Sequence, residues 1–173
     1  VTFNALADGT YDNCTITVTD NSSNVSNTLA TTSFVIDTTA PTVSSIYPTD
    51  NQSGVSITTD NISVTFSETM DTTSVTTNTS NTTCSGSFLL SSNNFSSCVQ
   101  MSSSPSSSNS YKTFTVDPNS NLSNSTTYKI RVTTGVKDTS GNTLSSQYET
   151  SSGFTSGGLF LTWGNSGTIL TSL

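Results

Sequence analysis

The sequence predicts an all-β sandwich, because short runs of β-branched and aromatic residues alternate with polar ones along most of its 173 residues. In the clearest run, Ile62, Val64 and Phe66 are separated by single polar residues. Polar turn signals divide such runs at roughly the spacing of a β-sandwich. No stretch shows the 3.6-residue period of an amphipathic helix, so we expect strands throughout.

A complete set of sandwich strands is expected between residues 41 and 155. Phe88–Leu90 and Val99–Met101 form a pair joined by cysteines, and the Ser-rich run at 102–110 is expected to be a polar loop. The other strands are marked by Val43, Ile46, Val55, Ile57, Ile62, Val64, Phe66, Phe114, Val116, Tyr128, Ile130, Val132, Tyr148 and Phe154.

Partial modules are expected on both sides of this sandwich. In residues 1–40, Cys14, Ile16 and Val18 share one strand face, and Phe34 and Ile36 lie on the inner face of another strand, which makes only part of a sandwich. Pro41 cannot donate to a strand ladder, so a linker is expected around it. In residues 156–173 two glycines follow Ser156, and this segment is expected to be a linker and the start of a further β module.

The composition excludes several classes of function. The net charge is −7, with four basic residues and no histidine, so no basic stripe exists to bind nucleic acid. The same charge disfavours attraction to anionic membranes. No run approaches the roughly 18 to 20 apolar residues of a membrane span. No signal peptide opens the sequence, so a secretion signal is expected upstream of Val1.

The three cysteines suggest one disulfide. Cys84 and Cys98 flank a short Ser-rich run, a spacing that suits a bridge between a strand and its return. A bridge would imply oxidising surroundings, whereas the alternative is two reduced, buried cysteines. Cys14 is left over, either with a partner before Val1 or as a small buried hydrophobic residue.

The sequence is not expected to encode an enzyme. Without histidine, neither a Ser-His-Asp nor a Cys-His arrangement can form, and zinc loses its commonest nitrogen ligand. Glu68 and Glu149 are the only glutamates, and nothing in the sequence places a pair of carboxylates in a cleft.

Several phrases resemble a known family. FSETMD follows the strand ending at Phe66, TTYKIRV precedes a later turn, and KDTSGN lies in that turn. With these phrases, residues 41–155 resemble the S-layer-type bacterial Ig-like repeat, found in tandem in surface proteins and adhesins. Residues 1–40, with DGTY, TVTD and a terminal IDTTAP, look like the last strands of a related Ig-like domain. The resemblance implies an Ig-like β-sandwich, an extracellular cell-surface location, neighbouring Ig-like domains in the same protein, and a structural or adhesive role.

Strand alternation in such a sandwich predicts a candidate calcium site between the first two modules. Asp37 ends the first module, and the turn containing Asp8 lies at the same end of it. The loops of the next module that face this junction carry Glu68, Asp71 and Asp138. Calcium takes about six to eight oxygen ligands, and backbone carbonyls would supply the remainder. A bound ion would stiffen the joint.

A purely structural alternative exists for the same residues. Asp37 and Asp138 would then cap turns by accepting hydrogen bonds from backbone amides, as Asp commonly does. The KDTSGN loop suits this alternative, because Gly141 and Asn142 tolerate positive φ.

Three functions remain open. The leading one is a non-catalytic spacer or stalk in a long surface protein. The second is a self-assembling filament or S-layer subunit, a homo-polymer in which a strand from a neighbouring chain completes a partial sandwich. The third is a carbohydrate-binding module, for which Tyr47, Tyr111 and Tyr148 are the candidate aromatic platform. The sequence does not identify a receptor.

Overall fold

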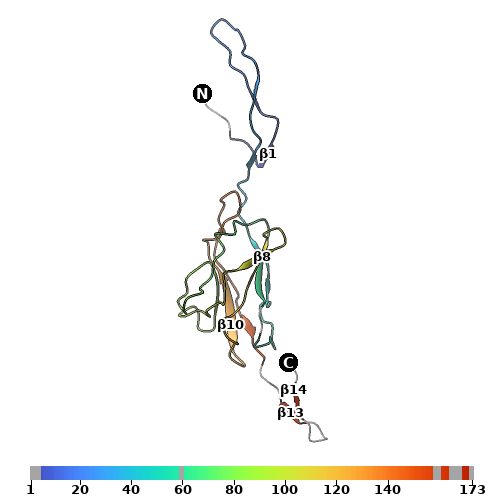
Figure 1. The fold of residues 1–173 in the computed structure, drawn as a ribbon, viewed down its shortest axis with the longest axis vertical. Helices are drawn as coiled ribbons and strands as arrows, with labels where there is room; N and C mark the ends of the chain where they lie inside the picture. The colour runs from blue at the N-terminus through green and yellow to red at the C-terminus, as the bar shows by residue number, and fades with distance from the viewer. Residues whose placement is uncertain (1–4, 59–60, 158–160, 164–168, 172–173) are drawn as a thin grey trace. The chain divides into compact units, whose positions relative to one another are not determined.

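The computed structural model describes residues 5–58, 61–157, 161–163 and 169–171 (Figure 1). It divides into two compact units, an N-terminal unit (Val1–Thr39) and a main unit (Ala40–Leu173). Every regular element of the described residues is a β-strand, which confirms the all-β prediction. Within these residues no helix is long and apolar enough to cross a membrane.

The first sheet of the main unit contains four antiparallel strands. Its order is β5 (Val43–Tyr47), β6 (Ile62–Phe66), β9 (Thr113–Val116) and β8 (Ser106–Ser108). Along β6 the strict alternation seen in the sequence becomes alternating burial, because the apolar side chains face inward and the Ser and Thr side chains between them are half-buried.

The second sheet is built around β10 (Thr127–Val132). The strands β7 (Phe88–Ser91), β11 (Tyr148–Glu149) and β12 (Phe154–Thr155) all pair antiparallel with it. The strand β10 also alternates, with its apolar residues buried and the residues between them more exposed. The period-2 pattern in TTYKIRV therefore marks a strand with one buried face.

The two sheets, which include the green and orange strands of Figure 1, face each other, and a single hydrophobic core lies between them. Phe66 and Phe114 of the first sheet meet edge to face with ring centroids 6.0 Å apart. Tyr128 and Phe154 of the second sheet stack at 5.7 Å. This arrangement confirms the predicted sandwich, and most of the residues expected to mark its strands lie in or against the core.

The chain enters and leaves this sandwich at opposite ends. It enters where β6 finishes, since the N–H of Ser67 donates to the carbonyl of Thr42 at 2.9 Å. The ends of β6 and β10 lie on the same side, because Met70 and Asp138, which follow them, form a bridge. The chain leaves beside β12, whose last residue pairs with Thr127 at the beginning of β10. The exit therefore lies at the end where β6 and β10 begin.

A short parallel pairing joins the first and last parts of the sandwich. Residues 51–55, which follow β5, run beside residues 153–157, as the parallel bridge between Val55 and Ser156 shows. We call this pairing the terminal ladder. Asp50, just before it, accepts hydrogen bonds from the loop between β11 and β12, so the beginning and the end of the sandwich are joined twice.

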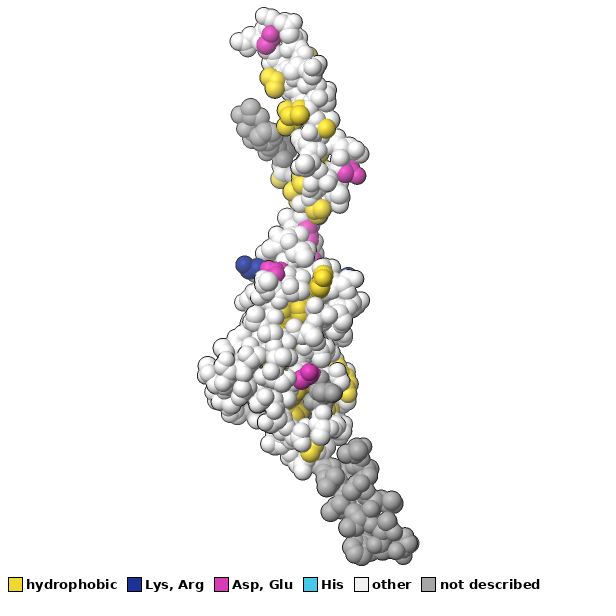
Figure 2. Space-filling view, in the orientation of Figure 1, with side chains coloured by type: hydrophobic (Ala, Val, Ile, Leu, Met, Phe, Trp, Pro, Cys, Tyr) yellow, Lys and Arg dark blue, Asp and Glu magenta, His cyan; other side chains and the backbone are white. Residues whose placement is uncertain are grey.

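The N-terminal unit is a two-stranded ribbon. The strands β1 (Gly9–Tyr11) and β4 (Phe34–Ile36) pair, as do β2 (Thr15–Ile16) and β3 (Leu29–Ala30). Phe34, expected on an inner face, is 39 % exposed, because no second sheet covers it within the described part of this unit. None of the unit's described residues is buried. Figure 2 shows apolar side chains on the surface of this unit. Its large apolar side chains that are more than one third exposed are Leu6, Ile16, Val18, Val25, Leu29, Phe34 and Val35.

Two local predictions were wrong. The run at 102–110, expected to be a loop, contains β8, which pairs with β9 through its backbone. Because β8 consists of three serines, the sequence contains no alternation of apolar and polar residues that would predict this strand. Val55 and Met101, expected in regular strands, form isolated bridges to Ser156 and Pro118 instead.

The C-terminal tail contains one more strand pair. The strands β13 (Leu161–Trp163) and β14 (Ile169–Thr171) pair antiparallel. The predicted module at 156–173 otherwise falls largely outside the described residues, which omit 158–160, 164–168 and 172–173.

Candidate metal-binding carboxylates

The five predicted carboxylates belong to two different units. Asp8 and Asp37 lie in the N-terminal unit, and Glu68, Asp71 and Asp138 lie in the main unit. The two groups are therefore described separately.

Asp8 lies beside the last residues of the N-terminal unit. Its carboxylate accepts hydrogen bonds from the hydroxyls of Thr38 at 2.8 Å and Thr39 at 3.1 Å. The backbone and the hydroxyl of Thr38 hold the pKa of Asp8 below its usual value. Asp37 Oδ1 accepts the N–H of Thr39 at 3.0 Å. Asp8 thus binds both residues that end the unit, and Asp37 binds the last of them.

In the main unit, backbone hydrogen bonds hold two loops together. The N–H of Asp71 donates to the carbonyl of Lys137 at 2.9 Å, and that of Thr139 donates to Thr69 at 3.3 Å. One carboxylate oxygen of Glu68 and one of Asp138 lie within 4.8 Å of each other. The loops that carry FSETMD and KDTSGN are therefore neighbours at one end of the sandwich.

Asp138 is the most enclosed of these carboxylates, with 2 % of its surface exposed. Its Oδ1 accepts the N–H groups of Ser140 at 2.8 Å and Asn142 at 2.9 Å, and its Oδ2 accepts the Asn142 side chain at 2.8 Å. Burial raises the pKa of Asp138, but the hydrogen bonds from Asn142, Ser140 and Gly141 outweigh it, so the pKa lies below its usual value. The group is an anion at neutral pH.

Asp71 caps a turn in the neighbouring loop. Its Oδ1 accepts the N–H of Thr73 at 2.9 Å and the Thr73 hydroxyl at 2.7 Å. These two bonds, with a smaller contribution from the charge of Lys137, hold the pKa of Asp71 below its usual value. Asp71 and Asp138 both line an open pocket of about 560 Å³, together with Met70 and Tyr111.

This chemistry suits two roles. Ionised carboxylates close to one another are the oxygen ligands that calcium prefers. Asp37, Asp71 and Asp138 each also accept a backbone N–H from a residue two positions later, which is the turn-capping geometry that needs no ion. Each carboxylate can accept further bonds, because it has about four lone-pair positions.

Cys84 and Cys98 form the predicted disulfide, with an S–S distance of 2.08 Å and a Cα–Cα distance of 5.0 Å. Cys98 is buried in the main unit, and its N–H donates to the carbonyl of Thr82 at 2.8 Å. Cys14 is a free thiol in the described structure.

The three candidate tyrosines differ in exposure. Tyr47 is 45 % exposed and Tyr111 is 55 % exposed. Tyr148 packs against the core, and its burial, with the nearby charge of Asp50, raises its pKa. Tyr148 therefore does not offer an open aromatic face.

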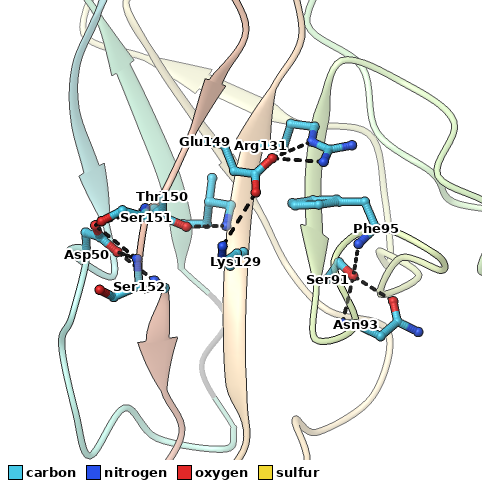
Figure 3. A network of polar contacts seen from close by, with 12 residues as sticks. Asp50, Ser91, Asn93, Phe95, Lys129, Arg131, Glu149, Thr150, Ser151 and Ser152 are labelled. Carbon is cyan, nitrogen blue, oxygen red and sulfur yellow. Dashed lines mark hydrogen bonds and ion pairs between the residues drawn. The ribbon is translucent and has the colours of Figure 1, made fainter.

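A polar network on the second sheet was not predicted from the sequence (Figure 3). Arg131 donates to one oxygen of Glu149 at 3.0 and 2.8 Å, and Lys129 lies 3.7 Å from the other oxygen. The guanidinium carbon of Arg131 lies 3.6 Å from the ring centroid of Phe95, in the loop closed by the disulfide. The pairing of Arg131 with Glu149 across two strands creates this network. Alternation places both residues in strands, but it does not give the register that brings them together.

Three comparisons show what this chain is similar to, and the family model is the one that supports the fold. The family model described as "Bacterial Ig-like domain" matches residues 37–156. Among solved structures, surface layer protein SbsC, domains 1–6, matches with a TM-score of 0.47 and 22 % identity, covering 69 % of this chain and 14 % of that one. The N-terminal part of the bacterial S-layer protein SbsC matches with a TM-score of 0.46 and 22 % identity, covering 69 % of this chain and 24 % of that one. The chain thus spans under a quarter of these structures. No curated protein sequence matches it significantly.

Proposed function

Because this chain belongs to the family of bacterial Ig-like domains, we propose that it is a non-catalytic spacer in a tandem Ig-like protein of the bacterial cell surface. Its role is to add length between a surface anchor and a distal part of the same protein. Its neighbours are then further Ig-like domains, and its location is extracellular.

The observation that carries this proposal is the path of the chain through the main unit. The chain enters beside Ser67 and leaves beside Thr127, at opposite ends of the sandwich. A domain whose ends are separated in this way adds its own length to a tandem protein, whereas a domain with adjacent ends projects sideways. The disulfide supports an extracellular location, since such bonds persist in oxidising compartments.

Small-angle scattering would test the spacer role directly. Proteins carrying one, two and three copies of residues 37–157 should grow in maximum dimension by a constant increment for each copy. A maximum dimension that does not increase with copy number would contradict the spacer role. Labelling of intact producing cells with an antibody raised against this chain tests the location separately, and no labelling would exclude a surface role.

We further propose that calcium stiffens the junction before the main unit, with Asp8, Asp37, Glu68, Asp71 and Asp138 as its carboxylate ligands. The proximity of Glu68 and Asp138 supports this proposal. The residues between Asp37 and Val43 are few and span at most about 20 Å when fully extended, which limits how far Asp37 can lie from Val43. The low pKa values of Asp8, Asp71 and Asp138 keep these groups ionised at neutral pH.

Thermal unfolding with excess calcium and with a chelator tests the metal. An ion that binds only the folded state stabilises it by RT ln(1 + [L]/Kd), so the unfolding temperature rises with the logarithm of the free calcium concentration once that exceeds Kd. We expect a shift of several degrees that Glu68→Gln abolishes, with Glu149→Gln as the matched control outside the cluster. If calcium shifts neither the wild type nor the control, the carboxylates act as turn caps alone.

A second candidate function rests on the N-terminal unit. Its described residues contain exposed apolar side chains and no buried one, and an isolated two-stranded ribbon is marginal in water. Covering strands would come from the preceding part of the same protein or from a neighbouring chain. The second source would make the chain a self-assembling subunit.

Sedimentation at increasing protein concentration distinguishes these sources. A self-assembling chain should form larger species as concentration rises, and Leu29→Lys should suppress them by placing a charge among the exposed apolar residues. A chain that stays monomeric at every concentration would leave the spacer as the single proposal.

A further inference from the structure

We propose that the main unit is a load-bearing module whose resistance to pulling resides in the terminal ladder between residues 51–55 and 153–157. This inference rests on the proposed spacer role, because a spacer between a cell and an attached surface carries tension along its length. The ladder would be the part of the molecule that decides when the module unfolds.

The direction of the load follows from the path of the chain. Tension on a tandem protein pulls residue 40 and residue 157 apart, and these lie at opposite ends of the sandwich. Residues 51–55 are then pulled through their N-terminal end, and residues 153–157 through their C-terminal end. Because the two segments run parallel, this load slides one along the other. All the hydrogen bonds between them lie across the load and resist it together.

The ladder contains four backbone hydrogen bonds. The N–H of Asn51 donates to Gly153 at 2.6 Å, and that of Thr155 donates to Gln52 at 2.7 Å. Val55 donates to Thr155 at 3.2 Å and accepts from Gly157 at 2.6 Å. Val55 is also buried, with 4 % of its surface exposed, so its side chain anchors the segment in the core. Sliding would break these bonds and expose Val55 at the same time.

Asp50 reinforces the ladder at its beginning. Its carboxylate accepts the backbone N–H groups of Ser151 at 3.1 Å, Ser152 at 3.1 Å and Gly153 at 2.6 Å, and the Ser151 hydroxyl at 2.7 Å. Hydrogen bonds to an ionised acceptor are stronger than neutral ones. This cluster joins residues about one hundred positions apart, so it closes the sandwich rather than capping a local turn.

The antiparallel pairing of β12 with β10 offers a contrast within the same protein. Thr155 pairs with Thr127 and Phe154 with Tyr128. If the chain is held at position 125 and at its C-terminus, both handles lie at the same end of the sandwich, and β12 peels from β10 one bond at a time. Peeling requires less force than sliding, because the bonds no longer share the load.

Single-molecule pulling on the whole 173-residue chain tests the proposal. We expect unfolding of the main unit to require several times more force between the chain ends than between position 125 and the C-terminus. The unfolding of the main unit is identified by the increase in chain length that it releases. This increase becomes larger when the disulfide is reduced, because the loop between Cys84 and Cys98, with a sequence separation of 14, is then released as well. Equal forces in the two directions would overturn the proposal.

Two variants test the ladder itself. Val55→Pro removes one ladder donor, and Asp50→Ala removes the carboxylate cluster. Each should raise the unfolding rate at constant force by about fivefold or more for every net hydrogen bond lost. The control is Val116→Ala, which truncates a buried residue of β9 outside the ladder and lowers thermal stability without touching these bonds. We expect Val116→Ala to raise the unfolding rate at constant force much less than its loss of thermal stability would suggest.

The outcomes separate this proposal from the spacer role. If Val116→Ala weakens the module under load as much as the two ladder variants do, the resistance is spread through the core and the ladder proposal fails, while the spacer role stands. If the scattering increments fail but the difference between pulling directions holds, the ladder is a property of the fold without a spacer function. Should Val55→Pro not fold, Asp50→Ala and the two pulling directions still decide the question.

Discussion

The two units of this chain are built from the same kinds of residue and reach different degrees of burial. The named strands of both pair antiparallel, and both units are rich in Ser and Thr and alternate apolar with polar residues along their strands. In the main unit this alternation places a continuous set of apolar side chains between two sheets. In the N-terminal unit the same alternation leaves Ile16 51 % and Leu29 64 % exposed. Alternation therefore specifies a strand, and burial requires a second layer.

The aromatic pairs of the two units show what the second layer adds. Tyr11 and Phe34 stack at 5.3 Å in the N-terminal unit, and Phe66 and Phe114 meet at 6.0 Å in the main unit. The first pair remains partly open to solvent, and the second is almost wholly enclosed. Full burial of one large apolar side chain contributes about 1.5 to 3 kcal/mol, so similar contacts differ greatly in their contribution to stability.

The largest difference is expected from truncating one ring of each pair. Phe114→Ala should lower the free energy of unfolding of the main unit by about 3 to 5 kcal/mol, because it removes a buried ring and leaves a cavity. Phe34→Ala should change that free energy by less than about 0.5 kcal/mol, since Phe34 lies in the other unit. Chemical denaturation followed by tyrosine fluorescence measures both. Equal effects would mean that the two units unfold together.

The cysteines provide the next contrast. Cys98→Ser opens the loop closed by the disulfide and should destabilise the main unit by about 3 kcal/mol, the value expected for a closed loop of this length. Cys14→Ser, in the N-terminal unit, should leave the melting temperature unchanged. Calorimetry of both variants, with reduced wild type as a reference, measures the effect. A Cys98→Ser variant as stable as the wild type would show that Phe95 and its contacts hold the loop without the bridge.

Two glycines with positive φ sharpen the comparison within the main unit. Gly153 has φ +80°, and a Cβ there would lie 2.3 Å from the carbonyl oxygen of Tyr128. Gly141 has φ +95° and open space around it. We expect Gly153→Ala to cost about 2 kcal/mol or more, and Gly141→Ala about 1 kcal/mol from backbone strain alone. Thermal unfolding of the two variants would contradict this ranking if Gly141→Ala were the more harmful.

The smallest effect concerns two aspartates that cap different structures. Hydrogen bonds from the Ser151 side chain, despite some burial, and from three backbone N–H groups hold the pKa of Asp50 below its ordinary value of 3.8. Because the folded-state pKa is the lower one, this stabilisation is present above pH 3.8 and is lost as pH falls through the folded-state pKa. Asp50→Asn should therefore weaken the dependence of the main unit's free energy of unfolding on pH below about pH 4. We call this acidic part of the curve the acid limb.

Asp20 is the matched control for this prediction. Its carboxylate accepts from Ser22 and Asn24 in a local turn of the N-terminal unit, and its pKa is also lowered, chiefly by Asn24. Asp20→Asn should leave the acid limb of the main unit unchanged. Urea denaturation at several pH values between 3 and 6 measures both variants. A flattened limb in the Asp20 variant would indicate that the two units are coupled.

The elements that the sequence predicted well are those in which side chains decide the structure. Ile62, Val64 and Phe66 alternate with hydroxyl residues, and one face of a sandwich strand imposes that alternation. The strand β8 was missed because its three serines pair through the backbone, which leaves no side-chain pattern. The terminal ladder was missed for a related reason, since Val55 meets a segment about one hundred residues away and only the fold sets that register.

At the candidate site too, features that depend on side-chain type could be predicted, and features that depend on the backbone could not. Residue type and strand alternation suggested that Glu68 and Asp138 lie near each other, and one oxygen of each lies within 4.8 Å of the other. The role of Asp50, the carboxylate that closes the sandwich, cannot be predicted from the sequence, because its partners are backbone N–H groups and a hydroxyl, which carry no recognisable motif. Oxygen ligands can be proposed from a sequence, but backbone donors become visible only in the fold.

The shortness of β8 has a consequence for a protein made of many similar domains. Neighbouring copies lie at high local concentration, and an exposed sheet edge can recruit another edge and start aggregation. Here the edge strand is three residues long, Pro105 precedes it, and the next three residues, Asn109, Ser110 and Tyr111, all have positive φ. A foreign strand would find very few consecutive groups to pair with. This edge of the sheet is thus protected against pairing with a neighbouring copy, although it carries almost no charge.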